Sequence, residues 1–309
     1  MKSIITVTVN PAVDKYASVQ KIEPDIKLRC TPPRFEPGGG GLNVSRAIMK
    51  LGGTSRAVTT AGGEMGRMLL ELLEEEGIET SSTAVQGQTR ENLTLYEEST
   101  GEQFRFGMPG PSISRDEWEM LLVEVESAEL APDFIVASGS LPRGAPENFY
   151  SRIAEIASRS GSKMILDTSG VGLKISPGAG IYMIKPNRNE LEQFAGGKLT
   201  TLKEMESTAY GLVRNAKCQI LVVSLGPEGA LLVSEEGPEW ISGPQVETIS
   251  SIGAGDSMVA GIVMKLAQDH PVREAVKFGV ACGAAAVMTP GSELCRKEDA
   301  FKLYKDMLS

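Results

Sequence analysis

The sequence predicts an α/β fold in which a mostly parallel sheet carries helices on both faces, because apolar runs of strand length alternate with amphipathic helical stretches. A chain of 309 residues with 41% hydrophobic and 23% charged residues can bury a large core. One stretch breaks the alternation and indicates a small antiparallel sheet inserted into the α/β body. We therefore expect a single domain over residues 1–309 with this insert.

The expected strands and helices follow the chain in alternation. Strand patterns cover 3–9, 133–142, 162–170 and 181–187, and helical patterns cover 41–53, 65–78 and the segments from about 254 and about 272. The segment 219–234 is typical of a hairpin that turns at 226–229. In a parallel sheet of this kind, ligands bind beyond the carboxyl ends of the strands.

The inserted sheet, which we call the lid, is expected over about 13–35 and 88–108. Apolar side chains of 92–106 alternate and share one face of a hairpin, namely Leu93, Leu95, Phe104 and Phe106. A hairpin with few partner strands cannot bury such a face by itself, and an exposed apolar patch usually marks an interface. We expect a homodimer joined through the lid.

Charge and composition exclude several classes of protein. The net charge of −9 argues against a nucleic-acid surface, and no apolar run approaches the ~18 residues of a membrane span. His270 is the only histidine, which leaves neither a histidine-rich metal site nor a Ser-His-Asp triad. The four cysteines are scattered, and we expect buried free thiols in a reducing compartment. A cytoplasmic protein without nucleic-acid or membrane partners is the expectation.

The segment "SSIGAGDSMVAG" at 250–261 places a carboxylate at the start of a helix, behind glycines. Backbone N–H groups at such a helix start bind anions, so Gly253, Ala254 and Gly255 are candidates for an anion hole. Asp256 could take a proton from an attacking hydroxyl as a general base. The alternative is that Asp256 is a simple N-cap.

Further patterns are candidates for phosphate and metal binding. The glycine run at 38–41 precedes a helix, but neither GxGxxG nor the GxxxxGK[ST] P-loop is present. In "KPNRNE" at 185–190, Asn187 and Glu190 are spaced to hold the water shell of Mg²⁺, or else to form a helix cap. The basic residues Lys27, Arg29 and Arg90 could clamp a phosphate, or they are separate solvated charges.

Six motifs occur in the order in which they occur in the ribokinase-like (PfkB) sugar kinases, and the chain resembles this family on their account. They are "TVNPAVD", "PGGGGLNVSRAI", "ASGSLP", "KPNRNE", "VVSLGPEGAL" and "GAGDSMVAG". The resemblance covers almost the whole chain and implies a ribokinase-like fold with a β lid. Within the family, "KLRCTPPRFEPGGGGLN" and "TREN" at 89–92 are most similar to the minor 6-phosphofructokinases of enteric bacteria.

The resemblance implies a kinase that uses ATP and Mg²⁺ to phosphorylate the 1-hydroxyl of fructose 6-phosphate. Asp256 would be the general base, and Gly253, Ala254 and Gly255 would form the anion hole. The sugar hydroxyls and the 6-phosphate would be held by Asp14, Lys27, Arg29, Gly39, Asn43, Arg90, Asn92 and Ser138. The ATP site would contain Lys185, Asn187, Ser224, Gly226 and Gly229, and Glu190 would hold Mg²⁺ through water.

The resemblance also implies a site for K⁺ at Ser250, Ile252, Ala286 and Gly291. Thr289 and Glu293 depart from the pattern, since Asn and Arg are expected at these two positions. A kinase for tagatose 6-phosphate or fructose 1-phosphate is the nearest alternative, because the same clamp could hold either phosphate. A regulatory sensor of sugar phosphate or nucleotide, without turnover, is the other alternative, and the intact Asp256 with its glycines argues against it.

Overall fold

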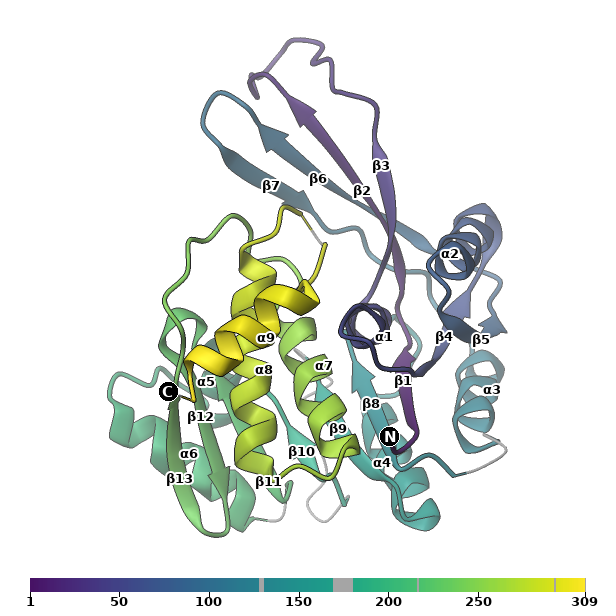
Figure 1. Ribbon diagram of the computed structural model, residues 1–309. Helices are drawn as coiled ribbons and strands as arrows, with labels where there is room; N and C mark the ends of the chain where they lie inside the picture. The colour runs from purple at the N-terminus through teal and green to yellow at the C-terminus, as the bar shows by residue number, and fades with distance from the viewer. Residues whose placement is uncertain (128–130, 169–179, 216, 292, 309) are drawn as a thin grey trace.

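A large sheet lies between two layers of helices, and a smaller sheet extends from one end of it (Figure 1). The computed structural model describes residues 1–127, 131–168, 180–215, 217–291 and 293–308. The strands of the large sheet are β1 (Ile4–Thr8), β4 (Arg56–Ala61), β5 (Glu79–Ala84), β8 (Phe134–Ser138), β9 (Lys163–Asp167), β10 (Met183–Ile184), β11 (Ile220–Ser224), β12 (Gly229–Ser234) and β13 (Gly237–Ser242). Their order across the sheet is β13-β12-β11-β10-β9-β8-β1-β4-β5.

The large sheet is parallel from β5 to β11, and β12 and β13 complete it in antiparallel pairing. Its central strands are almost wholly apolar and buried, as in the sequence IITVT of β1 and FIVAS of β8. Strands covered on both faces need such continuous apolar runs, because neither face meets water. This arrangement confirms the mostly parallel sheet and the β11–β12 hairpin expected at 219–234.

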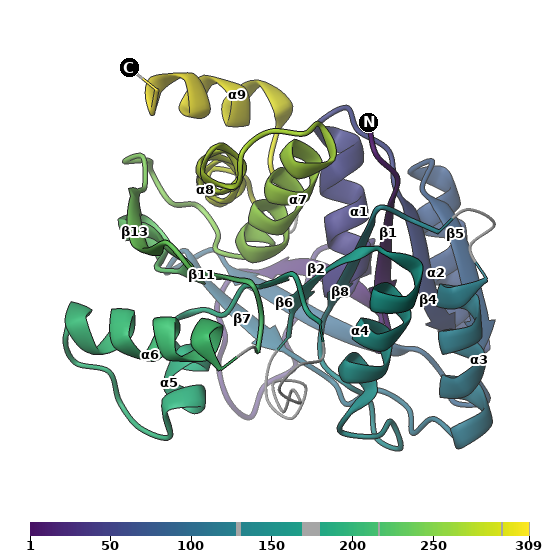
Figure 2. The same cartoon turned by 90° about the horizontal axis from the view of Figure 1, so that it is seen from below.

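Helices cover both faces of the sheet (Figure 2). One layer contains α1 (Gly40–Lys50), α2 (Gly63–Glu75), α7 (Ala254–Ala267) and α8 (Val272–Val287), with α9 (Lys297–Asp306) packed on α8. The other layer contains α3 (Arg115–Glu126), α4 (Phe149–Ser160), α5 (Arg188–Ala195) and α6 (Leu202–Arg214). In the described part of the chain, no helix is long and apolar enough to cross a membrane.

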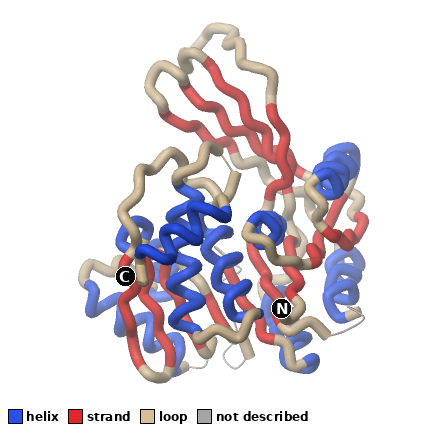
Figure 3. Tube along the Cα trace, viewed as in Figure 1, coloured by secondary structure: helices blue, strands red, loops and turns tan. Residues whose placement is uncertain are grey.

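The lid is a four-stranded sheet that projects beyond the helical layers (Figure 3). Its strands are β2 (Ala12–Val19), β3 (Arg34–Gly38), β6 (Arg90–Glu97) and β7 (Glu102–Phe106), in the order β3-β2-β6-β7. β2 pairs antiparallel with β3, and β6 pairs antiparallel with β7. The two inner strands, β2 and β6, run parallel, so the lid consists of two antiparallel pairs joined through a parallel contact.

Several boundaries differ from the expected ones. The strand expected at 181–187 is only the two residues of β10, and the last two residues of the strand expected at 162–170 lie outside the described residues. The expectation of four buried thiols was wrong for Cys30, which is exposed, whereas Cys218, Cys282 and Cys295 are buried free cysteines. Cys30 is exposed because it lies in the lid segment between β2 and β3, most of which is exposed, where it bridges to Val19 at the end of β2.

Candidate active site

Polar side chains gather where the parallel strands of the large sheet end. Ser138 is the last residue of β8, Asp167 is the last of β9, and Ser224 is the last of β11. Lys185 directly follows β10, and Asn10 comes two residues after β1. Carboxyl ends of parallel strands lie at one edge of the sheet, so the chain brings these residues together there. Of the five, Ser138, Lys185 and Ser224 were expected from the sequence.

The helix α7 begins at this edge with an unusual turn. Gly253 is its N-cap and has a left-handed backbone with φ of 73°. A Cβ added there would lie 2.6 Å from Cδ2 of Leu294, so both backbone angle and space demand glycine. The alternative that Asp256 is the N-cap is wrong, because Asp256 lies within the first turn and no side chain caps the helix. The first N–H groups of α7 are therefore left for an external anion.

Asp256 is held in a setting that suits a general base. One of its carboxylate oxygens, Oδ2, accepts a hydrogen bond of 2.9 Å from Nδ2 of Asn43 on α1. Burial, together with the charge of Asp167, raises the pKa of Asp256 to about 6, against the opposing effects of Asn43 and Lys185. A carboxyl group with this pKa is mostly ionised at neutral pH and still basic enough to accept a proton.

Lys185 supplies positive charge beside the start of α7. Its side chain is 4% exposed, and its Nζ lies 3.2 Å from Oδ1 of Asp167. A Cβ added to Gly255 would lie 3.6 Å from the same Nζ, which places the ammonium group next to the helix start. An ammonium group and backbone N–H groups aimed at one spot can stabilise the charge of a phosphoryl group in transfer.

The base of the lid contributes a second carboxylate. Oδ1 of Asp14 on β2 accepts a hydrogen bond of 2.8 Å from Nδ2 of Asn92, its neighbour on β6. The Asn92 amide is fixed because its Oδ1 accepts a bond of 3.1 Å from the backbone N–H of Met108. Burial raises the pKa of Asp14, and the Asn92 bond opposes this. The charge of Asp14 also acts on Asp256, so the two carboxylates face one site.

The glycine run joins the lid to the sheet edge. A Cβ added to Gly40 would lie 2.2 Å from Oγ of Ser138, so only glycine lets α1 begin against the end of β8. Gly39 is the N-cap of α1, and Asn43 lies one turn further on. This close approach brings Gly39, Asn43 and Ser138 to the site, as the sequence predicted.

Arg90 also lies at the base of the lid. It is the first residue of β6, paired with Ala12, and its guanidinium group donates to the backbone oxygens of Asn10, Pro11 and Met108. The acceptors in these three bonds are neutral carbonyl oxygens, so the bonds leave the positive charge of Arg90 uncompensated. Burial lowers the pKa of Arg90, while the charge of Asp14 raises it.

Lys27 and Arg29 are not brought to Arg90 within one chain. Both are exposed in the loop between β2 and β3, beyond the bridge that joins Val19 to Cys30. Val19 ends β2, roughly 23 Å from Ala12 at the rise of a strand, and this loop forms the far end of the lid (Figure 1). The sequence could not show this separation, because it does not reveal which way β2 runs relative to β6.

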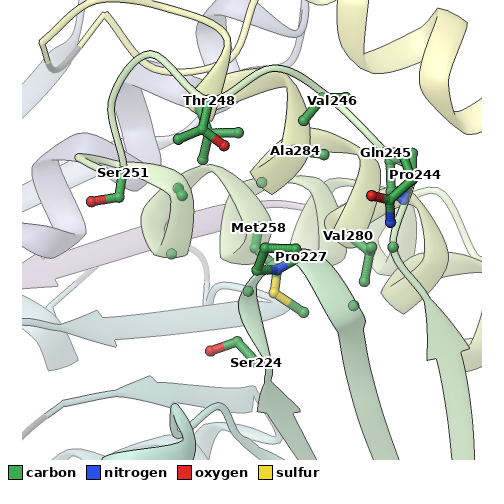
Figure 4. A pocket seen from close by; sticks show the side chains of 17 residues that line it. Ser224, Pro227, Pro244, Gln245, Val246, Thr248, Ser251, Met258, Val280 and Ala284 are labelled. Atoms are coloured by element: carbon green, nitrogen blue, oxygen red, sulfur yellow. The ribbon is translucent and has the colours of Figure 1, made fainter.

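A mostly apolar cavity of about 280 Å³ lies beyond the start of α7 (Figure 4). Ser224, Gly226 and Gly229, three residues expected at the ATP site, line it together with Ala254 and Gly255. The remaining lining residues were not singled out in the sequence: Pro227, Gly243, Pro244, Gln245, Val246, Thr248, Ser251, Met258, Val280, Gly283, Ala284 and Val287. Small residues on α8 open this space, and a planar aromatic base fits an apolar slot of this kind.

Asn187 and Glu190 form the helix cap that was the alternative to a metal role. The Asn187 side chain accepts from the N–H of Glu190 at 2.9 Å, and Glu190 Oε2 accepts from the N–H of Asn187 at 2.8 Å. Burial and the charge of Asp167 raise the pKa of Glu190. Glu190 therefore lies close to another carboxylate, which is a setting that attracts a cation. Among the described residues, no group of three or more His, Cys, Asp or Glu side chains could by itself hold a metal ion.

The residues expected around K⁺ lie beside the lid. Ser250 Oγ donates to Oε1 of Gln103 on β7 at 3.3 Å. The Ala286 carbonyl accepts both the N–H and the hydroxyl of Thr289, at 3.1 and 2.8 Å. The Thr289 hydroxyl has one proton and also lies 3.1 Å from the carbonyl oxygen of Leu294, so the Ala286 oxygen is not saturated and its place in the K⁺ site stays a prediction. Ile252 and Gly291 lie in the same pair of loops.

Three functional candidates were missed in the sequence. Asp167 has the same signal as Ser138, since it is the last residue of a buried apolar strand. Asn10 is buried, and among the described residues its Oδ1 is the buried side-chain oxygen that lacks a hydrogen-bond partner. Arg46 is a charged residue on the buried face of α1, a position where a charge is rare unless it is paired.

Comparisons with known proteins agree with this geometry. The model of the "pfkB family carbohydrate kinase" matches residues 5–299. The ATP-dependent 6-phosphofructokinase isozyme 2 of Escherichia coli is 40% identical over 308 residues, covering 98% of both chains. The 1-phosphofructokinase of Bacillus subtilis is 32% identical over 286 residues, covering 93% of both.

Solved structures show the same fold throughout the chain. Crystal structures of phosphofructokinase-2 from E. coli in complex with potassium and in complex with fructose-6-phosphate cover 100% of both chains at 38% identity, with TM-scores of 0.93 and 0.92. The fold is thus ribokinase-like, as expected. Since the family model and these relatives each span nearly the whole chain, the protein belongs to the pfkB family of carbohydrate kinases.

Proposed function

We propose that this chain is an ATP-dependent 6-phosphofructokinase, which phosphorylates the 1-hydroxyl of fructose 6-phosphate to give fructose 1,6-bisphosphate and ADP. The observation that carries the proposal is Asp256, ionised and bonded to Asn43, in the first turn of an uncapped helix beside Lys185. Asp256 accepts the hydroxyl proton, and the oxygen attacks the terminal phosphoryl group of ATP. The N–H groups around Gly253, Ala254 and Gly255 receive the charge of that group.

The sugar would lie between the lid base and the start of α7. Asp14, Asn43 and Ser138, with the backbone at Gly39, would hold its hydroxyl groups. Arg90 and Asn92 would hold the 6-phosphate within one chain. Lys27 and Arg29 would contribute only if paired lids carry them over the site of a second chain.

ATP would enter from the other side of α7. The base would fill the apolar cavity next to Gly226 and Gly229, and the phosphates would pass Ser224 and Asn187 toward Lys185. Glu190 would hold Mg²⁺ through water near Asp167, where the cation offsets the charge of the phosphates. Glu190 can do this with Oε1, because its helix-capping bond uses Oε2.

K⁺ would take oxygens from Ser250, Ile252, Ala286 and Gly291. The assembly would be a homodimer joined through the outer face of the lid. On that face Leu93 pairs with Phe106 and Leu95 with Phe104, and Phe106 is 45% exposed. The free thiols suit a reducing compartment, and we propose a cytoplasmic location.

A panel of sugar phosphates tests the proposed substrate. Purified protein is assayed for ADP release with Mg-ATP and fructose 6-phosphate, tagatose 6-phosphate or fructose 1-phosphate, with ATP alone as the blank. We expect the highest kcat/KM for fructose 6-phosphate. A higher kcat/KM for either of the other two would identify that sugar phosphate as the substrate instead. Fructose 1-phosphate is included because a 1-phosphofructokinase is among the relatives. Binding without ADP release would indicate a sensor.

A further inference from the structure

Arg46 carries a buried guanidinium group on α1, next to Asn43, the residue that donates to Asp256. Its side chain is 3% exposed and lies one turn beyond Asn43. Nε and Nη2 donate to the two carboxylate oxygens of Glu76, each at 2.6 Å. Nη1 donates to the carbonyl oxygen of Pro37 at 3.0 Å and to Oδ1 of Asn43 at 3.3 Å. Nη2 also lies 3.5 Å from Glu36.

The bond from Arg46 determines which way round the Asn43 amide lies. A guanidinium group can only donate, so the Asn43 oxygen must face it, and the Asn43 nitrogen then faces Asp256. A rotated amide would place its oxygen against the Asp256 carboxylate and its NH₂ group against the guanidinium group. Both contacts would then be repulsive. Arg46 is itself fixed by Glu76 and Pro37, so it holds Asn43 from a rigid support.

We propose that Arg46 is a positioning residue for catalysis, which fixes the Asn43 amide so that its NH₂ group always donates to the catalytic carboxylate. Arg46 touches neither of the reacting groups, and its effect passes through Asn43. The proposal rests on the proposed kinase function, but not on which sugar phosphate is the substrate.

The electrostatics of the site make this orientation important. Asp256 is packed among the carboxylates of Asp14 and Asp167, with Lys185 as the neighbouring cation. The two carboxylates and burial raise the pKa of Asp256, whereas Asn43 and Lys185 lower it. An Asn43 oxygen turned toward Asp256 would remove one stabilising donor and add a repulsive dipole. The pKa of Asp256 would then rise above its present value, and a larger fraction of the base would be protonated at neutral pH.

A purely structural role for Arg46 is the competing explanation. Arg46 joins α1 to Glu76, which caps the end of α2, and to Glu36 and Pro37 at the end of β3. Loss of these contacts alone would lower stability and disturb the lid without altering the titration of Asp256. The two roles therefore differ in the pH profile and in whether the effects of Arg46 and Asn43 add.

The test combines Arg46→Gln with Asn43→Ala in a double-mutant cycle of kcat. We expect Arg46→Gln to lower kcat at pH 7 by roughly tenfold or more, since a bond to a charged group is lost, with little change in KM for ATP. The acid limb of its kcat profile should move to higher pH. In the Asn43→Ala background, Arg46→Gln should cost no further kcat, because Arg46 then has no amide to fix.

Glu76→Gln is the matched control, because it weakens the support of α2 and leaves the bond from Arg46 to Asn43 in place. It should lower the melting temperature but keep the wild-type pH limb. Arg46→Lys, which has one donor group in place of the fork, should recover stability more than kcat. Additive losses in the double mutant, or the same pH profile in all variants, would overturn the proposal. The assay uses whichever sugar phosphate the wild type accepts, so failure of the fructose 6-phosphate assignment leaves this test intact.

Discussion

The Asn43 amide nitrogen lies 2.9 Å from Oδ2 of Asp256, although the two residues are 213 positions apart in the chain. This contact connects the glycine run at the start of α1 with the helix start that would hold the transferred phosphoryl group. The Asp256 carboxylate is thus oriented from α1, the side on which we propose that the sugar lies.

Replacing Asp256 by Asn should leave a folded enzyme with very low turnover. An amide cannot accept the hydroxyl proton, and a general base contributes typically ~10²–10⁴-fold to the rate. We expect kcat to fall by about this factor, with only a modest change in KM for the sugar phosphate. Steady-state kinetics and a melting curve check this, and a wild-type kcat would contradict the role of Asp256.

The activity of the wild type should fall in acid with a midpoint near the pKa of Asp256. Burial and Asp167 raise that pKa to about 6, and only the ionised carboxylate acts as a base. The value of kcat/KM is therefore at its plateau above this pH and declines tenfold per pH unit below it. Kinetics between pH 5 and pH 8 define the acid limb of the kcat/KM profile, and circular dichroism over the same range verifies that the protein stays folded. A flat profile down to pH 5 would exclude Asp256 as the titrating base.

Replacing Arg90 by Ala should affect the sugar phosphate far more than ATP. A charge-assisted phosphate contact is worth typically ~1.5–3 kcal/mol, so KM for fructose 6-phosphate should rise roughly ten- to a hundredfold. Arg90 also donates to three backbone oxygens at the lid base, so some loss of stability should accompany this. KM for both substrates is measured in parallel.

The exposed Arg115 on α3 provides a control for the Arg90 variant, since Arg115→Ala removes a surface charge that pairs with Glu119 on the same helix. It should leave both KM values unchanged. An equal rise of KM for ATP and for the sugar in Arg90→Ala would mean that Arg90 supports the fold and does not contact the phosphate.

Replacing Gly253 by Ala should lower both stability and turnover. A left-handed backbone costs a non-glycine residue roughly 1–2 kcal/mol, and the new methyl group would press on Leu294. The anion hole would shift with it, so kcat should fall by more than tenfold. Gly211→Ala in α6, where a Cβ meets nothing within 4 Å, is the matched control and should stabilise the fold slightly. The same response in both variants would show that the turn at Gly253 has no special role.

Replacing Leu93 by Asp should split the proposed homodimer. Leu93 lies on the outer face of the lid with Phe106 as its cross-strand partner, and a carboxylate buried in an interface is strongly unfavourable. Sedimentation at micromolar concentration should give a dimer for the wild type and a monomer for Leu93→Asp. Tyr96→Asp is the control on the opposite face of the same strand, where the side chain is exposed. A monomeric, fully active wild type, or a dimeric Leu93→Asp, would refute the lid interface.

Much of the site is encoded locally and could be predicted. The glycines and the carboxylate of 253–256 form one continuous turn, so their geometry follows from the backbone preferences of a few neighbouring residues. Ser138 and Ser224 end apolar strands, and a parallel sheet places such ends together whatever the details of packing. The predicted lid strands likewise follow from a two-residue alternation that is visible in the sequence.

The sequence by itself therefore determined the parallel α/β core, the helix start at Gly253 and the candidate base Asp256, because each depends on short-range pattern. Only the tertiary structure decided how distant segments meet. The parallel pairing of β2 with β6 leaves Arg90 at the lid base and carries Lys27 and Arg29 to the far end. The packing of α1 against α2 and β3 places Arg46 behind Asn43. These relationships depend on strand direction and on side-chain packing between remote elements, which no local preference specifies.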